Sequence, residues 1–119
     1  VKVIALSDTT GVSNPENISK LFSNLIPEFP DVEVGAHLHT APDDWEEKVH
    51  AAVTSGCTRF DAAIKGFGGC PMAADDLTGN MPTENLLSYF DKNSQNTGIN
   101  SSAFEDSIII ADKLFNSYH

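Results

Sequence analysis

The sequence predicts an α/β fold made of parallel βα units, and three observations support this class. Apolar runs of strand length, at residues 1–6, 32–38 and 59–64, alternate with segments of helical periodicity. The runs begin roughly 30 residues apart, the spacing of strand–helix–strand units with right-handed crossovers. Glycine and proline stand at the joins between segments. A complete (β/α)₈ barrel needs eight such units and about 250 residues, so 119 residues form either a small open sheet or part of a barrel.

The first unit begins with residues 1–6, whose nearly continuous apolar sequence is typical of a strand buried on both faces. Asn14 followed by Pro15 predicts a helix start, with an N-cap side chain and a proline in the first turn. Pro27 and Pro30 predict the end of this helix. Its apolar residues recur at helical spacing, at Ile18, Leu21, Phe22 and Leu25.

The second unit repeats this plan, with a strand at residues 32–38 and a helix opened by Pro42 and Asp43. Gly56 predicts the end of that helix, because glycine is the usual residue just past a helix C-terminus. A third strand follows at residues 59–64. One face of the second helix is apolar and comprises Trp45, Val49, Ala52 and Val53.

After the third strand, the sequence predicts a long loop rich in glycine and proline at residues 65–82 and a helix at 83–91. Ser102 and Glu105 match the capping-box pattern, which predicts a last helix at residues 103–116. The expected order of elements is therefore βαβαβαα.

The charge excludes some classes of partner. Seven Lys and Arg against 17 Asp and Glu give a formal charge of −10. Such a surface repels nucleic-acid phosphates and anionic membranes. No apolar run approaches the roughly 20 residues of a membrane span, so neither nucleic acid nor a membrane is an expected partner.

The two cysteines do not make a disulfide scaffold, which predicts a reducing, cytoplasmic setting. Cys57 lies between a helix-stopping glycine and a strand, so we expect it to serve packing. The chain starts at Val1, inside an apolar run, and we therefore expect it to be part of a larger protein.

Chemically capable side chains follow the predicted strands. Asp8 comes after the first strand, His37 and His39 end the second, and Cys70 and Asn80 follow the third. Active sites of parallel α/β folds form at the carboxyl ends of the strands. The sequence therefore predicts one site that contains all five residues.

His37 and His39 are two apart on a strand, so their side chains point to the same face. Two imidazoles in that arrangement can bind one cation. The alternative is two polar residues at a strand end, one of them hydrogen-bonded in the core. His50 lies within a helix and His119 ends the chain, and we expect both to be solvated.

Gly66, Gly68 and Gly69 precede Cys70 in a glycine-rich loop that is able to swing. The alternative is a plain linker with a small buried cysteine. A phosphate-binding loop is disfavoured, because no Lys-Ser/Thr pair follows the glycines.

Asn80 and Asp8 each have two interpretations. Asn80 is either a turn residue or an amide ligand for a hard cation. Asp8 either orients a ligand or takes a proton, or it caps the following loop.

Four stretches resemble the 3-hydroxy-3-methylglutaryl-CoA lyase branch of a metal-dependent, aldolase-like TIM-barrel family. They are LSDTTGV, AHLH, GFGGCPMA and TGNMPTENLLSYF, which begin at Leu6, Ala36, Gly66 and Thr78. The histidine pair is common to the wider family, whereas the cysteine loop followed by G-N and T-E is more specific to the lyases. The resemblance implies that residues 1–119 are a single partial barrel, similar to strands six to eight plus a C-terminal helix.

The resemblance also implies a divalent cation, Mg²⁺ or Mn²⁺. His37 and His39 match the imidazole ligands, and Asn80 matches the amide ligand. The family's first strand supplies an acidic ligand and an arginine, which no residue of this chain matches. The helix entry at residues 40–45 also differs from the family's polar, glycine-containing one.

Three more residues gain roles from the resemblance. Cys70 matches the catalytic cysteine on the mobile loop, and Asp8 an active-site acid near the substrate hydroxyl. Glu84 matches a carboxylate that supports the site. The implied reaction cleaves an acyl-CoA substrate, 3-hydroxy-3-methylglutaryl-CoA, to acetyl-CoA and acetoacetate, and we expect this 119-residue piece to be inactive alone.

Alternatives remain open. One is another acyl-CoA-condensing or aldolase member of the same metal family, and a second is a non-catalytic piece that binds metal weakly. A third is a metal-independent Cys–His hydrolase using Cys70, which chelators would distinguish. We also expect homo-oligomers, because strands 3–6 and 59–64 would present open sheet edges.

Overall fold

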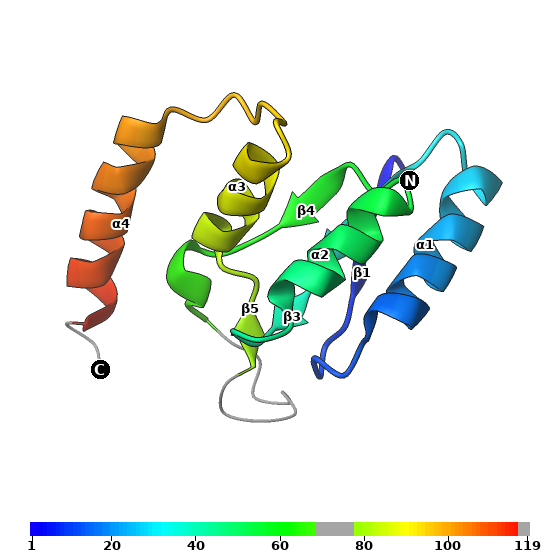
Figure 1. Cartoon of the computed structure of the whole chain (residues 1–119), viewed down its shortest axis with the longest axis horizontal. Helices are drawn as coiled ribbons and strands as arrows, with labels where there is room; N and C mark the ends of the chain where they lie inside the picture. The colour runs from blue at the N-terminus through cyan, green and yellow to red at the C-terminus, as the bar shows by residue number, and fades with distance from the viewer. Residues whose placement is uncertain (69–77, 117–119) are drawn as a thin grey trace.

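A computed structural model describes residues 1–68 and 78–116 of the chain (Figure 1). Three parallel strands form one sheet in the order β1–β2–β4, with β1 at Val3–Ser7, β2 at Glu33–His37 and β4 at Arg59–Asp61. The predicted α/β class with parallel strands is therefore confirmed. A second, two-stranded antiparallel sheet joins β3, His39–Thr40, to β5, Gly79–Asn80. The sequence analysis missed this pair, which puts Asn80 opposite His39.

The helices occupy the predicted parts of the chain. They are α1 at Pro15–Glu28, α2 at Trp45–Thr54, α3 at Thr83–Lys92 and α4 at Ser101–Asn116. The predicted start of α1 is confirmed, because the Asn14 side chain accepts a hydrogen bond from the main-chain N–H of Asn17. The Asn17 side chain accepts one from Asn14 in return, which completes a capping box.

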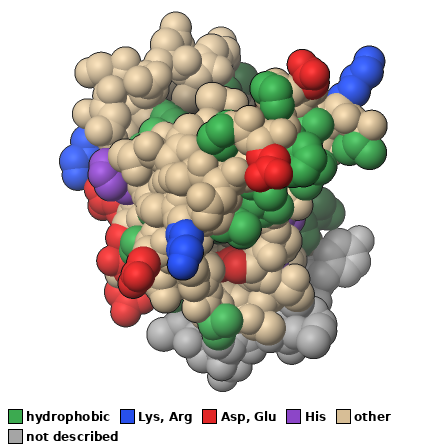
Figure 2. All heavy atoms as spheres, turned by 90° about the vertical axis from the view of Figure 1, so that its right-hand side faces the viewer, with side chains coloured by type: hydrophobic (Ala, Val, Ile, Leu, Met, Phe, Trp, Pro, Cys, Tyr) green, Lys and Arg blue, Asp and Glu red, His purple; other side chains and the backbone are tan. Residues whose placement is uncertain are grey.

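Strand β1 differs from its prediction, because it lies at an edge of the sheet and is not buried on both faces. Only β2 pairs with it among the described residues. Val3 and Ile4 are accordingly 41% and 37% exposed. Apolar side chains gather on the part of the surface that carries β1 and α1 (Figure 2).

Two predicted boundaries in the first and third units were also wrong. Pro27 lies inside the last turn of α1, which ends one residue later. A proline there removes one hydrogen bond of a turn that is already ending. Strand β4 stops at Asp61, and Ile64–Gly66 forms the 3₁₀ turn η1, in which Lys65 has a φ of 54°. The positive φ turns the chain out of the strand direction.

The start of the last helix is the other correction. The capping box predicted at Ser102 and Glu105 does not form the cap. Asn100 does so two residues earlier, where its side-chain oxygen accepts from the main-chain N–H of Ala103 at 2.9 Å. Three successive polar residues, Asn100 to Ser102, offered three possible caps, and the motif selected the wrong one.

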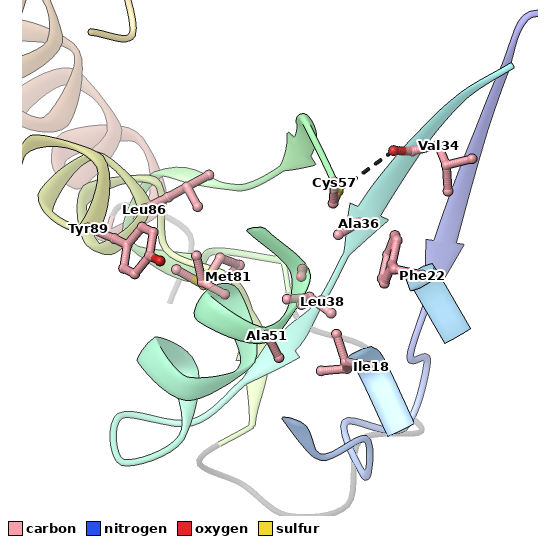
Figure 3. Packing of buried hydrophobic residues seen from close by; sticks show 12 residues of the cluster. Ile18, Phe22, Val34, Ala36, Leu38, Ala51, Cys57, Met81, Leu86 and Tyr89 are labelled. Atoms are coloured by element: carbon pink, nitrogen blue, oxygen red, sulfur yellow. Dashed lines mark hydrogen bonds between the residues drawn. The ribbon is translucent and has the colours of Figure 1, made fainter. Parts of the chain in front are cut away.

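The core lies between strand β2 and helices α1, α2 and α3 (Figure 3). Phe22 and Ile18 of α1 pack against β2, and Cys57 is buried beside Val34. The remaining buried apolar residues shown there include Ala36, Leu38, Ala51, Met81, Leu86 and Tyr89. This packing holds the carboxyl end of β2, where the histidines begin. None of the helices in the described ranges is long and apolar enough to cross a membrane.

Candidate functional site

Four residues that the sequence analysis marked as functional lie together at the carboxyl end of the parallel sheet. Asp8 directly follows β1, and His37 is the last residue of β2. His39 and Asn80 are paired in the β3–β5 sheet. The His39 main-chain N–H donates to Oδ1 of Asp8 at 2.6 Å, and the His37 and His39 ring centroids are 5.4 Å apart. The expected proximity of these groups is therefore found.

The His39 imidazole is held in one orientation. Its side chain is 7% exposed, and its Nδ1 lies 3.1 Å from the main-chain carbonyl oxygen of Asp8. A carbonyl oxygen only accepts hydrogen bonds, so Nδ1 must carry the proton. The lone pair is then on Nε2, which is the atom that a neutral imidazole offers to a metal.

The His37 imidazole is anchored in the same way by a residue that the sequence analysis missed. Its Nδ1 lies 3.3 Å from the carboxyl oxygen Oδ2 of Asp61, at the end of β4. Nδ1 therefore donates, and in the neutral imidazole Nε2 is the atom with the lone pair. Asp61 ends its strand as His37 ends β2, so the carboxyl-end rule could have identified it.

Asn80 completes the set of candidate ligands. Its side-chain nitrogen donates to the carbonyl oxygens of Phe67 at 3.0 Å and Gly68 at 2.5 Å. An amide coordinates a hard cation through its oxygen, and these bonds fix the orientation of the group. Two imidazole nitrogens and one amide oxygen suit a divalent cation. Within residues 1–68 and 78–116, no three His, Cys, Asp or Glu form a metal-holding group.

Asp8 is enclosed by donors, and two of them, Ser13 and Lys48, were missed by the sequence analysis. Oδ1 accepts from His39, while Oδ2 accepts from the Ser13 hydroxyl and lies 3.5 Å from Nζ of Lys48. The Lys48 side chain is 2% exposed. Lys48 comes three residues after Trp45 and four before Ala52, which puts it on the buried face of α2. This spacing could have indicated that the lysine is buried.

Glu84 and the glycines fix the start of the glycine-rich loop. Oε1 of Glu84 accepts from the main-chain N–H of Lys65 at 2.8 Å, which holds turn η1. Gly66 and Gly68 have φ values of 68° and 80°, in the region that favours glycine. Gly69 and Cys70, which the sequence analysis singled out, lie outside the described residues.

Replacing Gly66 by alanine should destabilise the protein more than the same change at Gly98. Both glycines have positive φ, so each alanine costs about 1–2 kcal/mol of backbone strain. A Cβ at Gly66 would also lie 2.9 Å from the main-chain oxygen of Asn80, whereas a Cβ at Gly98 meets nothing within 4 Å. Urea unfolding should show an additional loss of about 1–2 kcal/mol for Gly66→Ala. Equal losses would mean that Gly66 does not determine the position of Asn80.

The second cysteine and the third histidine lie away from this cluster. Cys57 is 4% exposed, as expected for a packing residue. Burial raises the pKa of its thiol, and Sγ donates to the carbonyl oxygen of Arg59 at 3.1 Å. His50 is exposed on α2, with Nδ1 2.8 Å from the Tyr89 hydroxyl. His119 lies outside the described residues.

The chain is similar in sequence to known lyases. A family model described as HMGL-like matches residues 1–108. An (R)-citramalyl-CoA lyase of Chloroflexus aurantiacus is 38% identical over 100 residues, 84% of this chain and 31% of that protein. A hydroxymethylglutaryl-CoA lyase of Pseudomonas mevalonii is 33% identical over 103 residues, 84% of this chain and 33% of that protein. The chain spans about a third of the length of these curated relatives.

Solved structures of HMG-CoA lyases have a similar fold. The Bacillus subtilis enzyme superposes with a TM-score of 0.86 at 23% identity, covering 98% of this chain and 39% of that chain. The Acinetobacter baumannii enzyme, in complex with coenzyme A and 3-methylmalate, gives 0.80 at 30% identity, covering 95% and 37%. The parallel α/β fold is therefore similar to the TIM barrel of these lyases. Which strands of a barrel β1, β2 and β4 represent stays a prediction.

Proposed function

The chain belongs to the HMGL-like family, and on that premise we propose that the whole protein is a divalent-metal-dependent lyase. It cleaves 3-hydroxy-3-methylglutaryl-CoA to acetyl-CoA and acetoacetate. One observation carries this proposal: the imidazoles of His37 and His39 are 5.4 Å apart, and each has its Nδ1 bonded to an oxygen acceptor. That arrangement leaves Nε2 of each neutral imidazole as the atom with the lone pair, which is the atom that binds a metal.

His37 and His39 would hold the cation through Nε2, and Asn80 would hold it through its amide oxygen. Mg²⁺ and Mn²⁺ fit this donor set, because an amide oxygen is a hard ligand. A bound divalent cation supplies Lewis-acid polarisation of the substrate's hydroxyl and acyl oxygens. The hydrogen bonds of Asp8 and Asp61 to the two histidines keep the ligands oriented before the cation binds.

Asp8 takes the proton of the substrate's tertiary hydroxyl. A carboxylate offers about four acceptor positions, and the described residues donate to Asp8 from Ser13, His39 and Lys48. The carbon–carbon bond then breaks, which turns the alcohol into the ketone of acetoacetate. The bond's electron pair stays on the thioester fragment, where Cys70 delivers a proton to carbon. The net transfer is one proton from oxygen to carbon.

The glycine-rich loop closes over the substrate in this proposal. Glu84 anchors the start of the loop through the Lys65 main chain, and Gly66 and Gly68 adopt turns that other residues disfavour. Closure would bring the Cys70 thiol to the substrate and exclude water.

The test uses the full-length protein with 3-hydroxy-3-methylglutaryl-CoA. We expect acetyl-CoA to appear with Mg²⁺ or Mn²⁺ and to stop appearing when a chelator removes the metal. Release of free coenzyme A that chelators do not stop would instead support a Cys–His hydrolase, since a thiol nucleophile needs no metal. A protein that binds the cation but cleaves no hydroxyacyl-CoA would contradict the proposal.

Citramalyl-CoA is the second candidate substrate. It is supported by the 38% identity to the (R)-citramalyl-CoA lyase. Competition between the two thioesters at equal concentration ranks their kcat/KM values directly. A ratio that favours citramalyl-CoA by tenfold or more would reassign the substrate without changing the role of the site residues.

We also propose that the 119-residue chain alone self-associates through its exposed sheet edge. Val3 and Ile4 of β1 are exposed apolar residues on a strand that pairs only with β2 among the described residues. Such edges pair with other strands. Sedimentation at high concentration should give dimers or larger species, and a single monomeric species would contradict the proposal.

The buried free thiol of Cys57 supports a reducing, cytoplasmic setting.

A further inference from the structure

Lys48 is a buried lysine whose neighbours all belong to the candidate site or to the segments that support it. Its Nζ donates to the carbonyl oxygens of Gly11 and His39, each at 3.1 Å. It also lies 3.5 Å from Oδ2 of Asp8 and 3.6 Å from Oδ2 of Asp44. One ammonium group thus connects the β1–α1 loop, the histidine strand and the start of α2.

Burial of this ammonium group needs an explanation. Removing a charged group from water is costly unless it is paired and hydrogen-bonded. Lysines on helices ordinarily extend to solvent, as Lys92 of α3 does with 72% of its side chain exposed. Two carboxylates and two carbonyl oxygens offset that cost at Lys48. A methyl-terminated side chain would fill the same space without needing these partners, so the charge has a use beyond packing.

From these contacts we infer that Lys48 is a positioning residue for His39 and Asp8, a role that rests on the proposed metal-dependent lyase. His39 is held at three atoms. Its N–H and its Nδ1 bond to Asp8, and its carbonyl oxygen accepts from Lys48. Lys48 in turn attracts the Asp8 carboxylate, which accepts from the His39 main-chain N–H, while Nδ1 bonds to the Asp8 main-chain carbonyl oxygen. Removal of the ammonium group therefore loosens two contacts, one to the His39 carbonyl oxygen and one to the Asp8 carboxylate. Both contacts help to orient Nε2 of His39.

The test compares Mn²⁺ affinity, by isothermal titration calorimetry, in full-length variants. Lys48→Met should weaken Mn²⁺ binding about 10- to 100-fold, the usual effect of losing a group that orients a ligand. In the lyase assay it should lower kcat while the KM for the acyl-CoA changes less than about threefold. Lys48→Arg, which keeps the charge, should recover part of both losses.

Lys48→Gln is the second variant, for use if Lys48→Met does not fold. The glutamine amide can donate to the two carbonyl oxygens, but it carries no charge. This variant should also weaken Mn²⁺ binding. Lys92→Met is the matched control: it removes an exposed ammonium that pairs with Glu46, and it should change neither quantity. A folded Lys48→Met or Lys48→Gln protein with wild-type Mn²⁺ affinity would overturn the inference and leave Lys48 as a stabilising residue only.

The same experiment separates this inference from the proposed function. Weakened Mn²⁺ binding in the Lys48 variants, with no cleavage of any acyl-CoA by the wild-type protein, would reject the lyase and retain the positioning role. Cleavage by the wild type with unchanged Mn²⁺ affinity in the variants would retain the lyase and reject the positioning role of Lys48. A wild-type protein that does not bind Mn²⁺ would overturn both.

Discussion

Replacement of His39 by alanine in the full-length protein is expected to weaken metal binding severely and, with it, to lower turnover. His39 offers Nε2 from an imidazole held by Asp8, and its side chain is 7% exposed. Loss of a group that only orients a ligand costs about 10- to 100-fold in metal affinity, so loss of the ligand itself should exceed the upper figure. The metal supplies several kcal/mol of transition-state stabilisation, so kcat/KM should fall by about 10³-fold or more.

His50→Ala is the matched control for this change. It also removes an imidazole, but from the exposed side of α2, where Nδ1 bonds only to the Tyr89 hydroxyl among the described residues. Mn²⁺ affinity and kcat/KM should both stay within a few-fold of the wild-type values. Similar losses in the two variants would mean that the effect of His39→Ala comes from folding and not from a lost ligand.

Replacement of Cys70 by serine should lower turnover about 10²- to 10⁴-fold, the usual cost of losing a general acid. A hydroxyl has nearly the same shape as a thiol, but it does not release a proton near neutral pH. The acyl-CoA should still bind, so kcat should fall far more than KM changes. Steady-state kinetics of the full-length variant measure both quantities.

Cys57→Ser is the control, and it should keep kcat within a few-fold of the wild type. Alkylation mapped by mass spectrometry adds an independent test. Cys57 is buried and its pKa is raised by burial, so its reactive thiolate is scarce at neutral pH. Cys70 should label first, and an acyl-CoA should protect it. Labelling of Cys57 first, or normal turnover of Cys70→Ser, would reject the proton-transfer role.

Local rules predicted the features that depend on neighbouring residues. The apolar runs located the strands, and Asn14 with Pro15 located the start of α1, because capping involves only the first helical turn. The strand period of two put His37 and His39 on one face, and their rings are indeed neighbours. The carboxyl-end rule then brought Asp8 to the same place.

Features that depend on distant parts of the chain were missed. The β3–β5 pair joins His39 to Asn80 through two residues on each side, too few for a periodic pattern. Lys48 was overlooked because lysine is a surface residue by composition, and only its four oxygen neighbours explain its burial. The exposure of β1 depends on which strands flank it, which a strand's own sequence does not specify.

In the proposed site, His37 and His39 bind one divalent cation through their Nε2 atoms. Pulsed electron paramagnetic resonance of the full-length protein loaded with Mn²⁺ measures this directly, because nitrogen nuclei bonded to the metal modulate the echo. We expect modulation from two imidazole nitrogens in the wild type, reduced to one in His39→Ala and unchanged in His50→Ala. Mn²⁺ bound without any histidine modulation would contradict binding by the two histidines.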